Sequence, residues 1–131
     1  MKKILFISRG KGWGHTVRDL AIIKALTRLR QDIEPILATY QDGIQCIQKN
    51  AIDNQMIKIL PISENEDSRI DDILSVIAEE LPSLIISDEE YEAARIDIKQ
   101  HIPVYFLTNY LTNREMNLRF RKRQYPCLTG F

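Results

Sequence analysis

The stretch KILFISRGKGWGHTVRDL (3–20) decides the fold class of this chain. It opens with a short apolar run, crosses a loop with three glycines and enters residues that repeat with helical spacing. A short apolar run that ends at glycines is typical of a strand buried on both faces. The stretch therefore predicts a strand over 3–8, a loop over 9–15 and a helix over 17–29.

The predicted helix over 17–29 has one apolar face. Thr16, with Asp19 three residues later, is expected to form a capping box at its start, and Asp19 is available for a polar face. The apolar positions fall at the spacing of an amphipathic helix. They are Val17, Leu20, Ala21, Ala25, Leu26 and Leu29.

The same alternation of patterns continues along the chain. Further buried strands are predicted over 33–40, 56–60, 83–87 and 104–108. Helices are predicted over 42–50, 70–81 and 88–100, and the polar run over 63–68 is expected to be a loop. Strands that alternate with helices favour a parallel sheet with right-handed crossovers. The expected fold is a Rossmann-like α/β domain in three layers, with about five parallel strands and helices on both faces.

Composition narrows the class of protein. The 131 residues suit one domain. Lys and Arg together number 18, as do Asp and Glu, so the chain as a whole has no charge bias toward nucleic acid. Its two cysteines form neither a zinc motif nor a disulfide framework, and no metal site is expected. The apolar run near the N-terminus is too short for a signal peptide, and we expect a cytoplasmic protein.

In such a fold, small molecules bind where loops leave the carboxyl ends of the strands. The first of these loops is rich in glycine and runs into a helix, so its backbone N–H groups and the helix dipole attract an anion such as phosphate. Two common fingerprints do not fit. Gly14 is followed by His15 instead of the Lys of a P-loop, and the spacing of Gly10, Gly12 and Gly14 differs from the dinucleotide pattern.

Two segments carry a resemblance to a known family. GWGHTVRDLAIIKAL (12–26) is similar to the G-x-G-H-x-x-R-x-L-A pattern that follows the first strand in the N-terminal, acceptor-side domain of glycosyltransferases with the two-domain GT-B architecture. LPSLIISDEEYEAARIDIKQHIPVYFL (81–107) resembles the later strands of that domain. The resemblance extends over 3–108 and is strongest to the family 28-like branch. That branch includes the lipid-linked peptidoglycan N-acetylglucosaminyltransferase and the diacylglycerol glucosyltransferases.

The resemblance implies a function shared between two domains. Residues 1–113 would form the acceptor-side domain, one half of a GT-B fold, and a second domain would hold most of the nucleotide-sugar. The donor would be UDP-linked, the transferred group a hexose or N-acetylhexosamine, and the transfer would need neither cofactor nor metal. Two domains need roughly 300 residues. We therefore expect a truncated chain, a shortened gene product or a subunit that acts with a separate donor-binding chain.

Two other functions stay open. Related sugar-nucleotide hydrolases share the G-H-x-x-R opening, and His15 would then act on water. A non-catalytic α/β domain that binds a ligand or regulates a partner also fits the pattern. The nature of the product separates the two enzyme classes, and a complete lack of turnover favours the third.

His15 and Asp88 are the candidate catalytic residues. An imidazole at the end of the first strand could take a proton from an acceptor hydroxyl or hold the acceptor by a hydrogen bond. Asp88 ends the fourth predicted strand, where it could orient His15 or bind the acceptor. The plainer alternatives are a histidine that packs the turn and an aspartate that caps the next helix.

The remaining candidate site residues surround His15 or follow the fifth strand. We assign four of them to the donor phosphates and three to the substrate. The alternatives are glycines needed for steric reasons alone, an exposed helix arginine, an aromatic ring that covers the loop and a solvated lysine. The phosphate group comprises Gly10, Gly12, Gly14 and Arg18, and the substrate group comprises Lys11, Trp13 and Asn109.

The segment over 114–131 is expected to be a basic tail or the start of an interdomain segment. Residues 114–123 hold five basic residues and one acidic residue, interleaved with apolar ones. Such a segment could contact the anionic inner face of a membrane, which would suit a lipid-linked acceptor. The alternative is a solvated connection toward a second domain.

Overall fold

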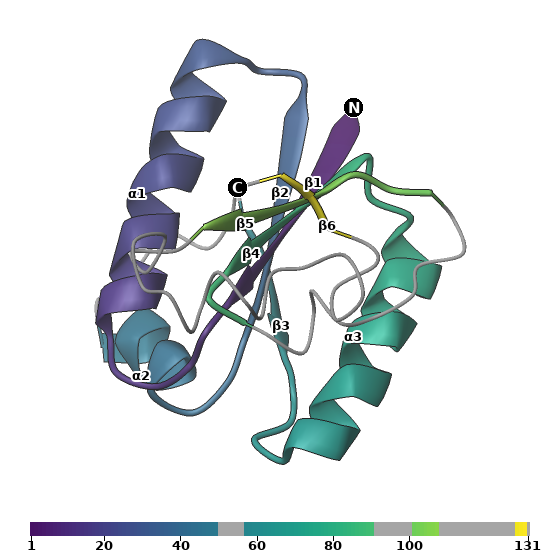
Figure 1. Cartoon of the computed structure of the whole chain (residues 1–131). Coiled ribbons are helices and arrows are strands. Elements are labelled where there is room, and N and C mark those ends of the chain that lie inside the picture. The colour runs from purple at the N-terminus through teal and green to yellow at the C-terminus, as the bar shows by residue number, and fades with distance from the viewer. Residues whose placement is uncertain (50–56, 91–100, 108–127, 131) are drawn as a thin grey trace.

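The described residues form a six-stranded sheet in which every strand pair is parallel (Figure 1). The computed structural model describes residues 1–49, 57–90, 101–107 and 128–130. The strand order is β3-β2-β1-β4-β5-β6. The strands are β1 (Lys2–Ser8), β2 (Ile33–Thr39), β3 (Lys58–Pro61), β4 (Leu84–Asp88), β5 (Val104–Leu107) and β6 (Leu128–Gly130). The helices are α1 (Gly14–Leu29), α2 (Asp42–Lys49) and α3 (Glu66–Glu80).

The helices cover both faces of the sheet, as predicted. Side chains alternate along β1, so Leu5 and Ile7 pack with α3, whereas Ile4 and Phe6 pack on the face covered by α1 and α2. Figure 1 shows α3 on one side of the sheet and the other two helices on the opposite side. This arrangement confirms the Rossmann-like three-layer fold.

The strand order reverses beside β1, which pairs with β2 on one edge and with β4 on the other. The last residues of the central pair, Ser8 and Asp88, lie opposite each other, and the backbone N–H of Arg9 donates to the carbonyl of Asp88 at 3.1 Å. In an open α/β sheet, the crevice at such a reversal is where ligands bind. The glycine loop and the end of β4 therefore lie at the expected position for a site.

The buried face of α1 differs from the predicted one. Thr16, Asp19, Leu20 and Ile23 are its buried residues, whereas Val17 is 52% exposed. The predicted capping box is also wrong, because the helix starts at Gly14 without a side-chain cap and Asp19 is fully buried. Polar residues occupy the first inner turns because the strand ends that they face are polar too: the Oγ of Ser8 lies 3.4 Å from Oγ1 of Thr16.

Two predicted segment boundaries are corrected. Helix α3 starts at Glu66, inside the run expected to be a loop, because the side chain of Asn65 accepts hydrogen bonds from two N–H groups of the first turn. The helix expected from residue 88 does not begin there. Asp88 is the last residue of β4, and Glu89 has a positive φ of 51°. The remainder of that prediction, 91–100, lies outside the described residues.

The sixth strand is an addition to the five predicted from the sequence. β6 extends the sheet beyond β5 from within the segment that was expected to be a tail or interdomain connection. Residues 108–127, which include Asn109 and the basic run over 114–123, lie outside the described residues. The division of the chain after residue 113 stays a prediction. Among the helices that the structure describes, none has the length and apolar character needed to cross a bilayer.

Candidate functional site

The candidate site centres on a hydrogen bond between His15 of α1 and Asp88 of β4. Along β4, Leu84 and Ile86 face the helices α1 and α2, and Asp88 continues this alternation to the strand's end. His15 stands in the first turn of α1, and its Nδ1 lies 3.1 Å from Oδ1 of Asp88. Asp88 is 1% exposed, whereas the side chain of His15 is partly accessible. The structure thus brings together the two candidate catalytic residues.

Arg18 contacts the same carboxylate. Its Nε donates to Oδ2 of Asp88 at 3.1 Å and its Nη2 donates to Oδ1. This bidentate hydrogen bonding fixes the plane of the carboxylate. The hydrogen bond to Asp88 raises the pKa of Arg18, against the opposing effect of burial. The arginine assigned to phosphate from the sequence therefore holds the candidate catalytic aspartate.

Asp88 is held ionised by these contacts. Burial on its own would raise the pKa of Asp88, but hydrogen bonds from Arg18, Asp19 and His15, together with the arginine's charge, outweigh burial and lower that pKa. An ionised carboxylate can only accept, so Nδ1 of His15 is the donor. In the neutral ring, the lone pair then lies on Nε2, which is the nitrogen able to take a proton from a substrate.

Glu89 stands at this second nitrogen. Its Oε2 lies 3.4 Å from Nε2 of His15, and its backbone N–H donates to the carbonyl of Leu107 at 3.0 Å. Glu89 adopts the left-handed conformation, which is uncommon outside glycine. No clear signal in the sequence points to Glu89, because acidic residues after a strand are also typical of the first turn of a helix. An acceptor that reaches Nε2 has to bind beside this carboxylate.

The glycine loop is tied to the start of α2. A Cβ at Gly10 would lie 2.0 Å from the carbonyl oxygen of Tyr40, so this position requires glycine for steric reasons. Gly12 has a φ of +78°, and its N–H donates to Oδ2 of Asp42 at 2.7 Å. The N–H of Asp42 in turn donates to the carbonyl of Gly10 at 3.0 Å. A phosphate that binds the N–H of Gly12 must replace a carboxylate already there.

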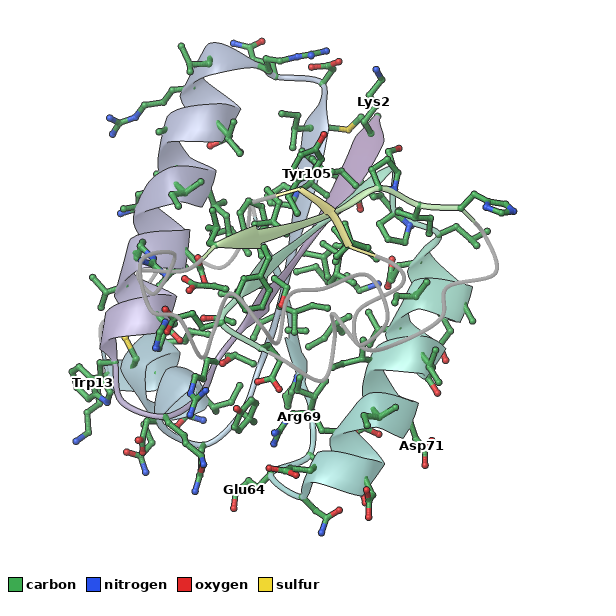
Figure 2. The ribbon with its side chains drawn as sticks, in the orientation of Figure 1. Lys2, Trp13, Glu64, Arg69, Asp71 and Tyr105 are labelled. Carbon is green, nitrogen blue, oxygen red and sulfur yellow. The ribbon has the colours of Figure 1, made fainter. Side chains whose placement is uncertain are left out.

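The other loop residues lie on the outside of this turn. No described residue beyond the neighbours of Gly14 in its own helix comes within 4 Å of an added Cβ, so packing against these residues does not require glycine there. Trp13 is 40% exposed, and Nζ of Lys49 lies 5.6 Å from the centre of its ring. Figure 2 shows Trp13 beside α2, and Lys11 is exposed in the same loop. Asn109, the third residue assigned to substrate, lies outside the described residues.

A buried charged cluster supports the loop after β4. The hydroxyl of Tyr40 donates to Glu90 at 2.7 Å, and Nε of Arg69 donates to the other carboxylate oxygen at 3.1 Å. The guanidinium also lies 4.1 Å from the centre of the Tyr40 ring. All three side chains are buried. The cluster joins the end of β2 and the start of α3 to the residue that follows Glu89, and no motif in the sequence pointed to it.

Comparisons with known proteins agree with this architecture. No family model matches the chain, and no curated protein matches it. Among solved structures, it is similar to a UGT transferase from Siraitia grosvenorii in complex with UDP, with a TM-score of 0.59 and 13% sequence identity. The likeness covers 82% of this chain and 24% of that one. It supports the predicted Rossmann-like α/β fold, and the chain spans about a quarter of the length of that protein.

Proposed function

We propose that this chain is the acceptor-binding domain of a glycosyltransferase that moves a sugar from a UDP-linked donor to an acceptor hydroxyl. The observation that carries the proposal is the bond between His15 and Asp88 at the reversal of strand order. It supplies a partly accessible imidazole whose outer nitrogen is oriented by a buried carboxylate. The structural likeness to a UDP-bound transferase supports the same class.

In the proposed reaction, His15 acts as a general base. Its Nε2 takes the proton of the acceptor hydroxyl while the oxygen of that hydroxyl forms a bond to the anomeric carbon of the donor. The bond from that carbon to the UDP oxygen breaks, and UDP leaves with the electron pair. Asp88 stabilises the imidazolium that forms, and Arg18 keeps Asp88 in place. A correctly placed general base contributes about 10²–10⁴ in rate.

The same proposal assigns roles to the remaining candidate site residues. Trp13 and Lys11 offer an accessible ring and charge to the acceptor, and Asn109 extends this set. The glycine loop, with Gly10, Gly12 and Gly14, would face the donor phosphates across the cleft. A second domain or subunit would hold the nucleotide. We also propose the family 28-like branch, in the cytoplasm, with membrane contact through 114–123 when the acceptor is lipid-linked.

The test compares wild type, His15→Ala and Lys24→Ala, the last being an exposed position on α1 that serves as control. Each chain is supplied with the polypeptide that carries the donor-binding half, with UDP-glucose or UDP-N-acetylglucosamine, and with candidate acceptors. Released UDP and glycoside are quantified. His15→Ala should lose at least about 99% of transfer and keep its unfolding midpoint, while Lys24→Ala keeps both.

Three outcomes contradict the proposal. Undiminished turnover of His15→Ala would remove His15 from the mechanism. Free sugar in place of glycoside would identify a sugar-nucleotide hydrolase. Absence of turnover with every donor, combined with tight binding to a protein partner, would identify a non-catalytic domain.

A further inference from the structure

Asp19 is a buried carboxyl group beneath the candidate catalytic pair. It lies four residues after His15, and therefore on the same side of α1 one turn further on. It is fully buried, and none of the described residues donates a hydrogen bond to either of its carboxyl oxygens. An ionised carboxylate in that situation would carry a large desolvation cost. A protonated carboxyl group, in contrast, needs an acceptor for its O–H.

Asp88 offers such an acceptor. Its Oδ1 accepts hydrogen bonds from Nδ1 of His15 and Nη2 of Arg18, and its Oδ2 accepts one from Nε of Arg18. A carboxylate has about four acceptor positions, two on each oxygen. Among the described residues, these three hydrogen bonds leave one acceptor position, on Oδ2. The mutual effect of Asp19 and Asp88 on each other's pKa indicates that the two carboxyl groups lie close together, and a hydrogen bond between two carboxyl groups requires that one of them carries a proton.

We propose that Asp19 carries that proton at neutral pH and donates it to Asp88, so that Asp19 is a positioning residue for the His15–Asp88 pair. The positioning role rests on the proposed function, whereas the location of the proton does not. Of the two acids, Asp88 accepts hydrogen bonds from the Arg18 guanidinium and the His15 ring, which favour its ionised form. Asp19 is fully buried and forms no ion pair or well-formed hydrogen bond with a cation among the described residues, so the proton belongs on Asp19.

The electrostatics of the surroundings support this assignment. Burial, followed by the hydrogen bond and negative charge of Asp88 on β4, raises the pKa of Asp19 to about 9. The hydroxyl of Ser8 on β1 and the charge of Arg18 on α1 act in the opposite direction and are weaker. Glu89 also faces this cluster, through His15 and Arg18. Loss of the proton would leave two buried carboxylates in contact, so Asp88 would no longer hold His15 in the same position.

The first experiment measures unfolding of the 131-residue chain by urea from pH 5 to pH 9. Between the ordinary carboxyl pKa of 3.8 and about 9, the folded chain holds a proton on Asp19 that the unfolded chain has released. The stability that this proton provides is therefore lost as pH rises through that window. Relative to Asp19→Asn, which cannot ionise, the folding equilibrium constant of wild type should fall by up to about tenfold per pH unit.

Asp71→Asn, at an exposed carboxyl on α3, is the matched control and should follow wild type (Figure 2). If the wild-type and Asp19→Asn curves run parallel, Asp19 is ionised throughout and the proposal is wrong. The carboxyl ¹³C signal of Asp19 gives the same answer without a variant. The proposal requires the protonated position at pH 7, and the ionised position would refute it.

The second experiment tests positioning. The ring ¹⁵N signals of His15 report which nitrogen carries the proton. Asp19→Asn keeps an N–H donor and should preserve the wild-type pattern, whereas Asp19→Leu fills the space without a donor and should alter it. An unchanged pattern in folded Asp19→Leu would refute the positioning role, and if that variant does not fold, loss of the pattern in Asp19→Asn would refute it. No sugar or acceptor is involved, so failure of the transfer assay would leave both results standing.

Discussion

The α-carbon of Gly10 packs against the backbone carbonyl of Tyr40 so closely that a Cβ at residue 10 would lie 2.0 Å from that oxygen. This approach holds the glycine loop against the end of β2. At Gly14, four residues later, a Cβ would meet none of the described residues beyond its neighbours in the helix. The two glycines thus have different reasons to be present.

We expect Gly10→Ala to lower the free energy of unfolding by about 1–3 kcal/mol or more, because backbone atoms have to move. Gly14→Ala, in the first turn of α1, should leave stability unchanged or raise it by up to about 1 kcal/mol. Urea denaturation of both variants measures the difference. Equal stability of the two variants would show that the loop relaxes away from Tyr40 without cost.

The second prediction concerns the contribution of the buried Arg69–Glu90 ion pair to stability. Glu90→Ala leaves a buried guanidinium without its carboxylate and should cost about 3–5 kcal/mol. Arg69→Met combined with Glu90→Leu removes both charges and should recover a large part of that loss. Arg30→Ala breaks an exposed pair with Asp32 and should change little. Thermal and urea unfolding compare the four proteins, and a mild effect of Glu90→Ala would mean that water reaches this cluster.

Asp88→Asn should affect both transfer and acid stability. The variant keeps the shape of the side chain but loses the charge that binds Arg18 and orients His15, so transfer by the complete enzyme should fall by about tenfold or more. The lowered pKa of Asp88 stabilises the fold above the ordinary value of 3.8, and this contribution is lost as pH falls through the folded value.

The advantage of wild type over Asp88→Asn should therefore be present at pH 7 and should disappear on acidification. Unfolding curves from pH 7 to pH 3 measure it. A difference between the two proteins that does not change with pH would contradict the assignment of Asp88 as an ionised, charge-paired group.

The fourth prediction concerns the effect of Asp42 on anion binding at the glycine loop. The carboxylate of Asp42 occupies the N–H of Gly12 in the structure. Asp42→Ala removes this competitor and one like charge, so UDP should shift the Gly12 amide signal at a lower concentration than in wild type. Glu34→Ala, a carboxyl removed at the opposite end of β2, is the control. The same UDP dependence in wild type and Asp42→Ala would show that the loop does not bind phosphate through Gly12.

The sequence was most informative where side chains are apolar on both faces of an element. The runs that became β1, β2 and β4 predicted a parallel sheet, because few other structures bury such runs. The inner face of α1 could not be predicted in the same way. Its first buried residues are Thr16 and Asp19, and polar residues at these positions normally indicate a cap or a solvated face.

Two residues of the candidate site could be predicted from their places in the sequence, but the contact between them could not. His15 stood out by its place after a glycine loop, and Asp88 by its place at the end of a strand. Their bond depends on the strand order, which periodicity does not specify. Glu89 and Glu90 lie in an acidic run, and only the positions of Arg69, Tyr40 and His15 in the fold explain why they are buried.

The strand order also determines when the site can form during synthesis. β1 and β2 pair within the first 39 residues, but the partner on the other edge of β1 begins only at Leu84. Until then, a nascent chain contains His15 and an open edge of its central strand, but not Asp88. Closing such a long loop is among the slower steps of folding. The contact between His15 and Asp88 is therefore a local marker for completion of the sheet.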